Sequence, residues 1–184
     1  MRYYLAHQGA PYGLAMEYRR VHVDGGTYFF TVTLLERSGN DLLTRHIDLL
    51  RQAVAQVKKH YPFKIHAWVV LPDHLHCLLE MPEGDCNYAL RWRLIKTLFS
   101  RSISADEFRS ATRLRRRERG IWQRRFWEHY VRDQWDFDRH LDYIHYNPLK
   151  HGYVKRVADW PHSTFHHFVR CGVYDRGWGD EIAP

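Results

Sequence analysis

Two apolar segments separated by a two-residue turn constrain the fold of this chain most. Phe63 to Leu71 (FKIHAWVVL) and His74 to Met81 (HLHCLLEM) have the β-branched, aromatic and aliphatic composition that is typical of strands. Pro72 and Asp73 lie between them. Because so short a connection joins antiparallel neighbours, the sequence predicts a β-hairpin over residues 63–81.

The segments on either side of this hairpin are predicted to form further strands and helices, which indicates an α+β protein. A strand is predicted over 27–35 and an amphipathic helix over 44–60, where apolar residues recur at three- and four-residue spacing. The charged stretch 105–120 is a loop or an extension of the helix before it. The remaining predicted elements are a helix over 88–103, a strand beginning at about Phe126 within 121–131, and a helix over 136–146 with Asp136 as a candidate N-cap.

This order, β-α-β-β-α-β followed by α, is typical of a ferredoxin-like (RRM-like) fold. We expect a four-stranded antiparallel sheet with helices on one face and a further C-terminal helix. The 184 residues fit a single domain, 1–184. Within it, we expect residues 1–26 to be an irregular N-terminal segment and residues 160–184 to form a short helix and a C-terminal tail.

Composition favours a polyanionic partner in the cytoplasm. The formal charge is +7, and aromatic residues make up 15% of the chain. Basic charge combined with many rings suits nucleic acid, with an anionic membrane surface as the second choice. The chain has no signal-like apolar segment at its start and no run long enough to cross a bilayer. Its three cysteines form no CxxC pair, as expected in a reducing cytosol.

The first chemical motif is His74-Leu75-His76, within the second strand of the hairpin. Side chains alternate along a strand, so both imidazoles project to one face while Leu75 and Cys77 project to the other. Two neighbouring neutral imidazoles can bind a divalent metal. In a chain with 14 histidines such a pair also arises by chance, so this motif alone leaves the two interpretations equally open. None of the other histidines has a Cys at zinc-finger spacing, and surface or packing roles are expected for them.

The second motif is Tyr143-Ile144-His145-Tyr146-Asn147-Pro148. Tyr143 and Asn147 are four residues apart and share one face of the predicted helix, where they can supply a nucleophile and a third metal ligand. Pro148 disfavours helical geometry at the residue before it, which puts Asn147 in a fraying last turn. Taken alone, two polar residues on a solvated face are the better explanation.

The third motif is a run of arginines between Arg109 and Arg125, with Trp122 inside it and Phe126-Trp127 just beyond. Such a run is usually a solvated face, but Arg beside exposed rings suits phosphate binding and base stacking. Arg19 and Arg20, and the basic residues of the predicted helix over 88–103, extend the same character. The candidate DNA-binding residues are Tyr18, Arg19, Arg20, Arg91, Arg93, Lys96, Arg115, Arg116, Arg117, Arg124 and Arg125.

Together the three motifs predict one metal-dependent reaction. A divalent ion held by His74, His76 and Asn147 would polarise a phosphodiester oxygen. Tyr143 would attack the phosphorus, form a phosphotyrosine link and free a 3′-hydroxyl. The covalent link conserves bond energy and so permits rejoining to a second end.

At these residues the sequence resembles the REP-associated tyrosine transposases, relatives of the single-tyrosine transposases of small insertion sequences. The matching stretches are GTYFFTVTL, WVVLPDHLHCLLEMP, IWQRRFWEHYVRD, YIHYNPLKHGYV and WPHSTFHHF. They occur in family order from about Tyr18 to Tyr174. The resemblance implies the His-hydrophobic-His nuclease fold, Mg²⁺ or Mn²⁺ dependence, and a single-stranded, hairpin-forming substrate of the repetitive extragenic palindromic type.

By the same resemblance, His74 and His76 are the metal ligands, Tyr143 is the nucleophile and Asn147 is the additional ligand. Insertion-sequence relatives often carry Gln where Asn147 stands, whereas the REP-associated branch has Asn. The segment Tyr18-Arg19-Arg20 and the basic helix become candidates for hairpin binding. The chain would act as a monomer or a homodimer.

Two other functions remain open at this point. One is a non-catalytic DNA-binding protein or repressor with an inactive site. The other is a metal nuclease that uses water and forms no covalent adduct with DNA.

Overall fold

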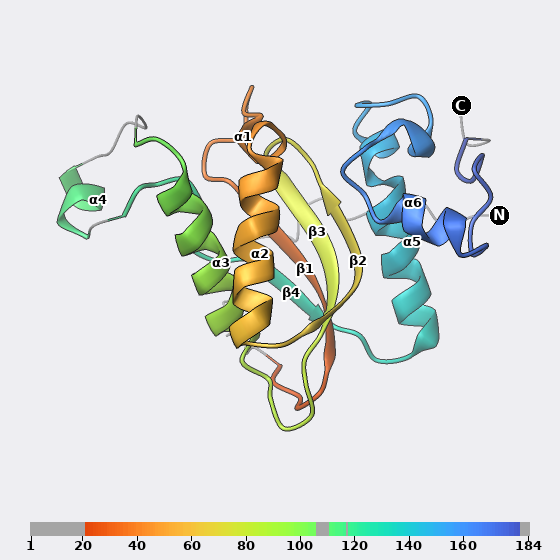
Figure 1. Ribbon diagram of the computed structural model, residues 1–184, viewed down its shortest axis with the longest axis horizontal. Helices are drawn as coiled ribbons and strands as arrows, with labels where there is room; N and C mark the ends of the chain where they lie inside the picture. Colours follow the sequence, from red (N-terminus) through yellow and green to blue (C-terminus); the bar gives the residue numbers. More distant parts are fainter. Residues whose placement is uncertain (1–20, 106–110, 117, 181–184) are drawn as a thin grey trace, which may run out of the picture.

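The computed structural model describes residues 21–105, 111–116 and 118–180, which form a four-stranded antiparallel sheet with helices on both faces (Figure 1). The strands are β1 (Thr27–Thr33), β2 (Lys64–Val70), β3 (His74–Glu80) and β4 (Trp127–Tyr130), in the spatial order β2-β3-β1-β4. This is the ferredoxin-like order that the sequence predicts. The predicted hairpin is also confirmed, since β2 pairs antiparallel with β3 and the Leu71 amide closes its turn on the His74 carbonyl at 2.8 Å.

Helices α2 (Ile47–His60) and α3 (Tyr88–Ser102) lie side by side on one face of the sheet (Figure 1). The larger core lies beneath them, because the apolar stripe of each helix faces the inward residues of β1 and β3. Trp92 of α3 is 1% exposed, and its ring meets that of Phe30 edge to face. A single turn of helix, α1 (Leu42–Arg45), precedes α2.

The opposite face of the sheet is covered by α5 (Gln134–Lys150), which packs against β2 and β3 (Figure 1). A second core lies between them, in which Leu141 and Ile144 of the helix meet Val69 and Leu78 of the strands. This face carries the even-numbered residues of β3, so α5 lies directly over the side of the sheet to which the two histidines project.

Helix α5 is longer at both ends than its sequence pattern indicates. It begins after Asp133, whose carboxylate accepts a hydrogen bond from the Asp136 amide, so Asp133 is the N-cap and the expectation for Asp136 was wrong. At the other end the helix continues through Pro148, which is buried, to Lys150. Packing therefore outweighs the local preference of the residue before proline, and Asn147 lies in regular helix rather than in a fraying turn.

The segment after α5 packs against the domain in its described part. It contains the short 3-10 helix η1 (Val157–Asp159) and α6 (Phe165–Arg170). Between these, the Val70 amide donates to the His162 carbonyl and the Thr164 amide donates to the Trp68 carbonyl, both at 2.9 Å. Residues 162–164 therefore cover the outer edge of β2.

The region 105–120 contains the five-residue helix α4 (Ala111–Arg115), which stands away from the rest of the molecule (Figure 1). Within the described part of this region, residues 111–115 are therefore helical rather than a loop, and α3 ends before it, at Ser102. Over the described residues, no helix combines the length and the apolar character that crossing a membrane requires.

Candidate active site

His74 and His76 lie on β3, the second strand from one edge of the sheet, and share the face covered by α5. Their rings meet at nearly a right angle, with centroids 5.0 Å apart. Leu75 and Cys77 project to the opposite face and belong to the core under α2 and α3. Because both imidazoles are almost fully buried, at 4% exposure each, their nitrogen atoms need partners within the protein or a bound ion.

One nitrogen of each imidazole already has a partner. The Asp73 carboxylate lies 2.6 Å from Nδ1 of His74, and its other oxygen accepts from Nε of Arg37. The hydroxyl of Thr31, opposite His76 on β1, lies 2.9 Å from Nδ1 of His76. The remaining nitrogen of His76, Nε2, is buried and has no hydrogen-bond partner. Such contacts at Nδ1 orient imidazoles that bind a metal through Nε2.

Electrostatics keep this pair neutral. Burial lowers the pKa of His76 well below its ordinary value, and the positive charges around it, including Lys150, act in the same direction. Burial also lowers the pKa of His74, although the neighbouring Asp73 carboxylate opposes that change. Neutral imidazoles have free lone pairs, and they are the form of histidine that binds metal ions.

Tyr143 projects from α5 toward this pair. Its ring meets the His76 imidazole edge to face, with centroids 5.2 Å apart, and packs in the same manner against Phe29 of β1 at 5.8 Å. The Lys150 ammonium lies 4.9 Å from the centre of the phenol ring. The helix thus brings a half-buried phenol and a cation to the two histidines.

Asn147 lies one helical turn beyond Tyr143 and is fully buried. Neither its amide nitrogen nor its amide oxygen has a hydrogen-bond partner. Unpaired buried amides are rare in folded proteins, because each one forfeits its contacts with water. A side-chain oxygen and an imidazole nitrogen, both buried and unpaired, fit the ligand set of a divalent ion.

Some residues around this site belong to none of the three motifs identified in the sequence. His151 follows α5, and its ring lies 5.3 Å from that of His74. Asp73 could have been identified from its place directly before the first histidine. Thr31 could not, because its contact depends on the register between β1 and β3.

Comparison with known proteins assigns the chain to a family. The model of the IS200-like transposases matches residues 31–147, a span that contains both histidines, Tyr143 and Asn147. A REP-associated tyrosine transposase of Escherichia coli strain K12 is 46% identical over 90% of this chain and 92% of its own length. This chain belongs to the REP-associated tyrosine transposases.

Two further matches agree with that membership. A Haemophilus influenzae protein of the same group is 49% identical over 88% of this chain and 92% of its own length. The structure of a REP-associated tyrosine transposase bound to a REP hairpin superposes with a TM-score of 0.77. That protein is 45% identical, and the match covers 91% of this chain and 93% of the other.

Three residues beside the Tyr143 site form a second polar cluster in this transposase. His129, Asp136 and His140 bring one potential ligand atom each to within 4.8 Å of one another, close enough to hold a metal ion. The Asp136 carboxylate already accepts hydrogen bonds from the His129 ring, at 2.8 Å, and from Arg132. We therefore interpret the cluster as a hydrogen-bonded connection between β4 and the start of α5.

The candidate DNA-binding residues differ in their surroundings. Tyr18, Arg19, Arg20 and Arg117 lie outside the described residues. The exposed members are Arg93, Arg115, Arg116, Arg124 and Arg125. The Lys96 ammonium donates to the Gln123 carbonyl at 2.9 Å and lies over the rings of Trp122 and Phe126.

Arg91 requires a correction. It is 2% exposed, and its guanidinium donates to the carbonyls of Pro62 and Asn87 and to the Asp85 carboxylate. These contacts hold α3 to the start of β2. The residue is therefore structural, because periodic spacing along a basic helix does not reveal which arginine turns inward.

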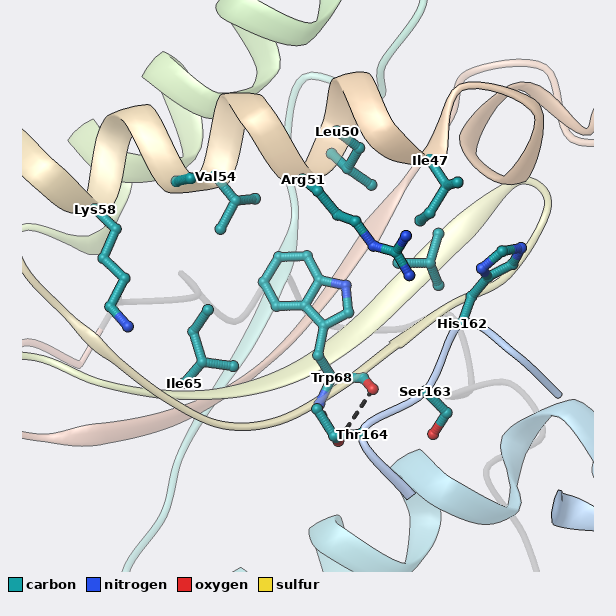
Figure 2. Close-up of a pocket in the computed structure, with 12 residues that line it drawn as sticks. Ile47, Leu50, Arg51, Val54, Lys58, Ile65, Trp68, His162, Ser163 and Thr164 are labelled. Carbon is teal, nitrogen blue, oxygen red and sulfur yellow. Dashed lines mark hydrogen bonds between the residues drawn. The ribbon is translucent and has the colours of Figure 1, made fainter. Parts of the chain in front are cut away.

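A cavity of about 360 Å³ lies between α2 and β2, on the face of the sheet opposite Tyr143. Figure 2 shows its apolar lining around Trp68, with Arg51 and Lys58 of α2 beside it and His162 at one end. None of the predicted catalytic or metal-binding residues lines it. The cavity is therefore separate from the candidate active site.

Proposed function

We propose that this chain cuts and rejoins single-stranded, hairpin-forming REP DNA through a covalent phosphotyrosine, with Tyr143 as the nucleophile. The observation that carries the proposal is the contact between the Tyr143 ring and His76, across the interface between α5 and β3. A phenol in contact with an imidazole whose Nε2 is buried and unpaired suits a metal-assisted transfer of a phosphodiester.

His74, His76 and Asn147 are the residues that would hold Mg²⁺ or Mn²⁺. The buried, unpaired Nε2 of His76 and the unpaired amide of Asn147 support this ligand set. When bound, the ion would supply Lewis-acid polarisation of a non-bridging phosphate oxygen. Asp73 and Thr31 would hold the two imidazoles in the orientation that binding requires.

In the chemical step, the phenolic oxygen of Tyr143 forms a bond to phosphorus while the bond from phosphorus to the 3′-oxygen breaks. The phenol loses its proton, and the departing oxygen gains one to become a free 3′-hydroxyl. Lys150, whose ammonium lies over the phenol ring, would offset negative charge on the phosphate. Attack by a 3′-hydroxyl on the phosphotyrosine reverses the step and rejoins the strand.

The nature of the substrate rests on similarity and charge. A transposase that is 45% identical to this chain is bound to a REP hairpin in its structure. The formal charge of +7 and the exposed arginines, Arg93, Arg115, Arg116, Arg124 and Arg125, suit binding of the phosphate backbone. We propose these five as DNA contacts, with Lys96 and the Tyr18 to Arg20 segment beside them.

A denaturing gel tests the proposal. The protein is incubated with an end-labelled REP hairpin that carries single-stranded flanks, with Mg²⁺, with Mn²⁺ or with a chelator. We expect a slowly migrating protein–DNA adduct that requires the ion and is lost in Tyr143→Phe. The matched control is Tyr61→Phe, which changes a phenol at the end of α2, and it should form the adduct as the wild type does.

The alternatives give different gels. Cleavage without an adduct, retained in Tyr143→Phe, would mean that water is the nucleophile. Binding without cleavage under every condition would mean a non-catalytic DNA-binding protein. Either result would overturn the proposed reaction.

A further inference from the structure

Strand β4 carries a large exposed ring on the same face of the sheet as the two histidines. Trp127 pairs with Thr31 of β1, and Thr31 pairs with His76 of β3 on its other side. These three residues therefore form one row across the sheet. Because neighbouring strands lie about 4.8 Å apart, the backbone of Trp127 is roughly 10 Å from that of His76.

Among the described residues, α5 covers the half of this face that contains the histidines more fully than the half that contains β4. Helix α5 packs against β2 and β3, whereas β4 is the edge strand beyond β1. Trp127 is 48% exposed, although its neighbour Glu128, which projects to the opposite face, is only 5% exposed. An exposed indole of this size is a common feature of binding surfaces.

Its neighbours fix the orientation of the Trp127 ring. Phe29 meets it edge to face at 5.6 Å, and His129 lies nearly parallel to it, with the ring planes at 8° and the centroids 6.0 Å apart. His129 is held in turn by the Asp136 carboxylate and stacks on His140 at 4.7 Å. A ring held in this way loses little conformational entropy when it binds a flat ligand.

Positive charge flanks the same strand. Arg125 precedes Trp127 by two residues and is exposed. Arg132 follows the end of β4 and keeps 65% of its side chain exposed while its Nε donates to Asp136. An aromatic ring between two cations suits a single-stranded nucleic acid, in which a base stacks while the phosphates on either side of it are neutralised.

From this arrangement we propose that Trp127 stacks on one unpaired base of the strand that is cut, close to the scissile phosphate. The inference rests on the proposed function, because it takes the Tyr143 site as the position of that phosphate. Phe29 connects the two places, since its ring contacts both Trp127 and Tyr143. The base would cover the open indole and set the position of the strand along the row toward His76.

The test measures binding rather than cleavage. Fluorescence anisotropy gives the Kd of Tyr143→Phe protein for a REP hairpin with single-stranded flanks, and then for a series in which one flanking nucleotide at a time is abasic. We expect one position at which the missing base weakens binding between about fivefold and a hundredfold. In the double variant with Trp127→Ala, the abasic nucleotide at that position should have no further effect.

Two more variants separate stacking from a loss of structure. Trp127→Phe keeps an aromatic face and should retain both tight binding and sensitivity to the abasic position. Trp135→Ala removes a ring that is 62% exposed at the start of α5 and should leave the abasic profile unchanged. The inference is overturned if Trp127→Ala shows the same abasic profile as the parent protein, or if no position in the series matters. Failure of the proposed reaction would instead be seen as a missing adduct with wild-type protein.

Discussion

The phenol ring of Tyr143 meets the imidazole of His76 edge to face, with the ring centroids 5.2 Å apart and the planes at 71°. The two residues come from different layers of the molecule, α5 and β3. Their contact depends on the packing of Leu141 and Ile144 against the sheet, which sets the position of the helix. The packing of that second core therefore positions the site. Measuring stability and activity separately in each variant distinguishes an effect on the fold from an effect on the chemistry.

Asn147 should lower the stability of the protein in the absence of metal. Its amide is buried without a hydrogen-bond partner, a situation that costs about 1–3 kcal/mol. Asn147→Leu should therefore stabilise the metal-free protein by about 1 kcal/mol, which corresponds to a rise in Tm of roughly 2–4 °C. Adduct formation should be lost in the same variant. Thermal unfolding with a chelator, followed by the adduct gel, measures both effects.

A carboxylate at this position provides the control. Asn147→Asp keeps a ligand oxygen but buries a charge, so it should lose stability without metal and regain it when Mn²⁺ is added. A fully active Asn147→Leu protein would contradict the assignment of Asn147 as a ligand.

Asp73 should set the affinity for the divalent ion, although it is not proposed to touch the ion. Its carboxylate lies 2.6 Å from Nδ1 of His74 and also binds Arg37. Loss of such a partner typically weakens metal binding by about 10- to 100-fold. We expect this weakening in Asp73→Asn when Mn²⁺ binding is measured by titration calorimetry. Asp159→Asn, in an exposed ion pair with Arg156, should bind Mn²⁺ as the wild type does.

Much of this arrangement could be predicted from the sequence. The hairpin was predictable because two apolar runs flank a short turn. The opposite orientations of Cys77 and His76 were predictable because strand side chains alternate. The motif spacing also puts Tyr143 and Asn147 on one helical face. These features depend on local geometry, which the order of residues determines.

Other features depend on tertiary contacts and could not be predicted. The continuation of α5 through Pro148 follows from burial of that residue, which no local preference reveals. The inward turn of Arg91 depends on the position of the Pro62 carbonyl. The pairing of Thr31 with His76 depends on strand register, as does the row that ends at Trp127.

The protein should lose stability in acid because the ionised carboxylate of Asp136, which stabilises the fold, becomes protonated. Burial opposes its charge, but the hydrogen bonds from His129 and Arg132 outweigh that effect and lower the pKa of Asp136 from 3.8 to about 2. A carboxyl whose pKa is lower in the folded state stabilises the fold at pH values above its unfolded pKa. That contribution, about 2 kcal/mol, should therefore be complete above about pH 5 and lost progressively as the pH falls toward 2.

Urea unfolding at pH 7, 4, 3 and 2 measures this dependence. Asp136→Asn should be less stable than the wild type at pH 7, and the difference should shrink through the pH 4 to 2 interval. Asp138→Asn, a change at an exposed position one turn into the same helix, serves as the control. A difference that stays constant with pH would show that the Asp136 charge does not stabilise the fold.

Arg91 and Arg93 are two residues apart on α3, but their substitution should have different effects. Arg91→Ala should lower the stability of the protein, whereas Arg93→Ala should weaken DNA binding. Arg91→Ala removes a buried guanidinium that donates to the carbonyls of Pro62 and Asn87 and to the Asp85 carboxylate, and it should cost about 3 kcal/mol in urea unfolding. Arg93 is exposed, so Arg93→Ala should change stability by less than about 0.5 kcal/mol.

When REP hairpin binding is measured as a function of salt, Arg93→Ala should have the larger effect and Arg91→Ala the smaller. If Arg93 neutralises one phosphate, its removal should reduce the slope of log Kd against log salt by about 0.7–0.9. Folded Arg91→Ala protein should keep the wild-type slope, because the Arg91 guanidinium faces carbonyl and carboxylate oxygens inside the protein. A reduced slope in Arg91→Ala and an unchanged one in Arg93→Ala would mean that α3 presents a different face to DNA from the one exposed in this structure.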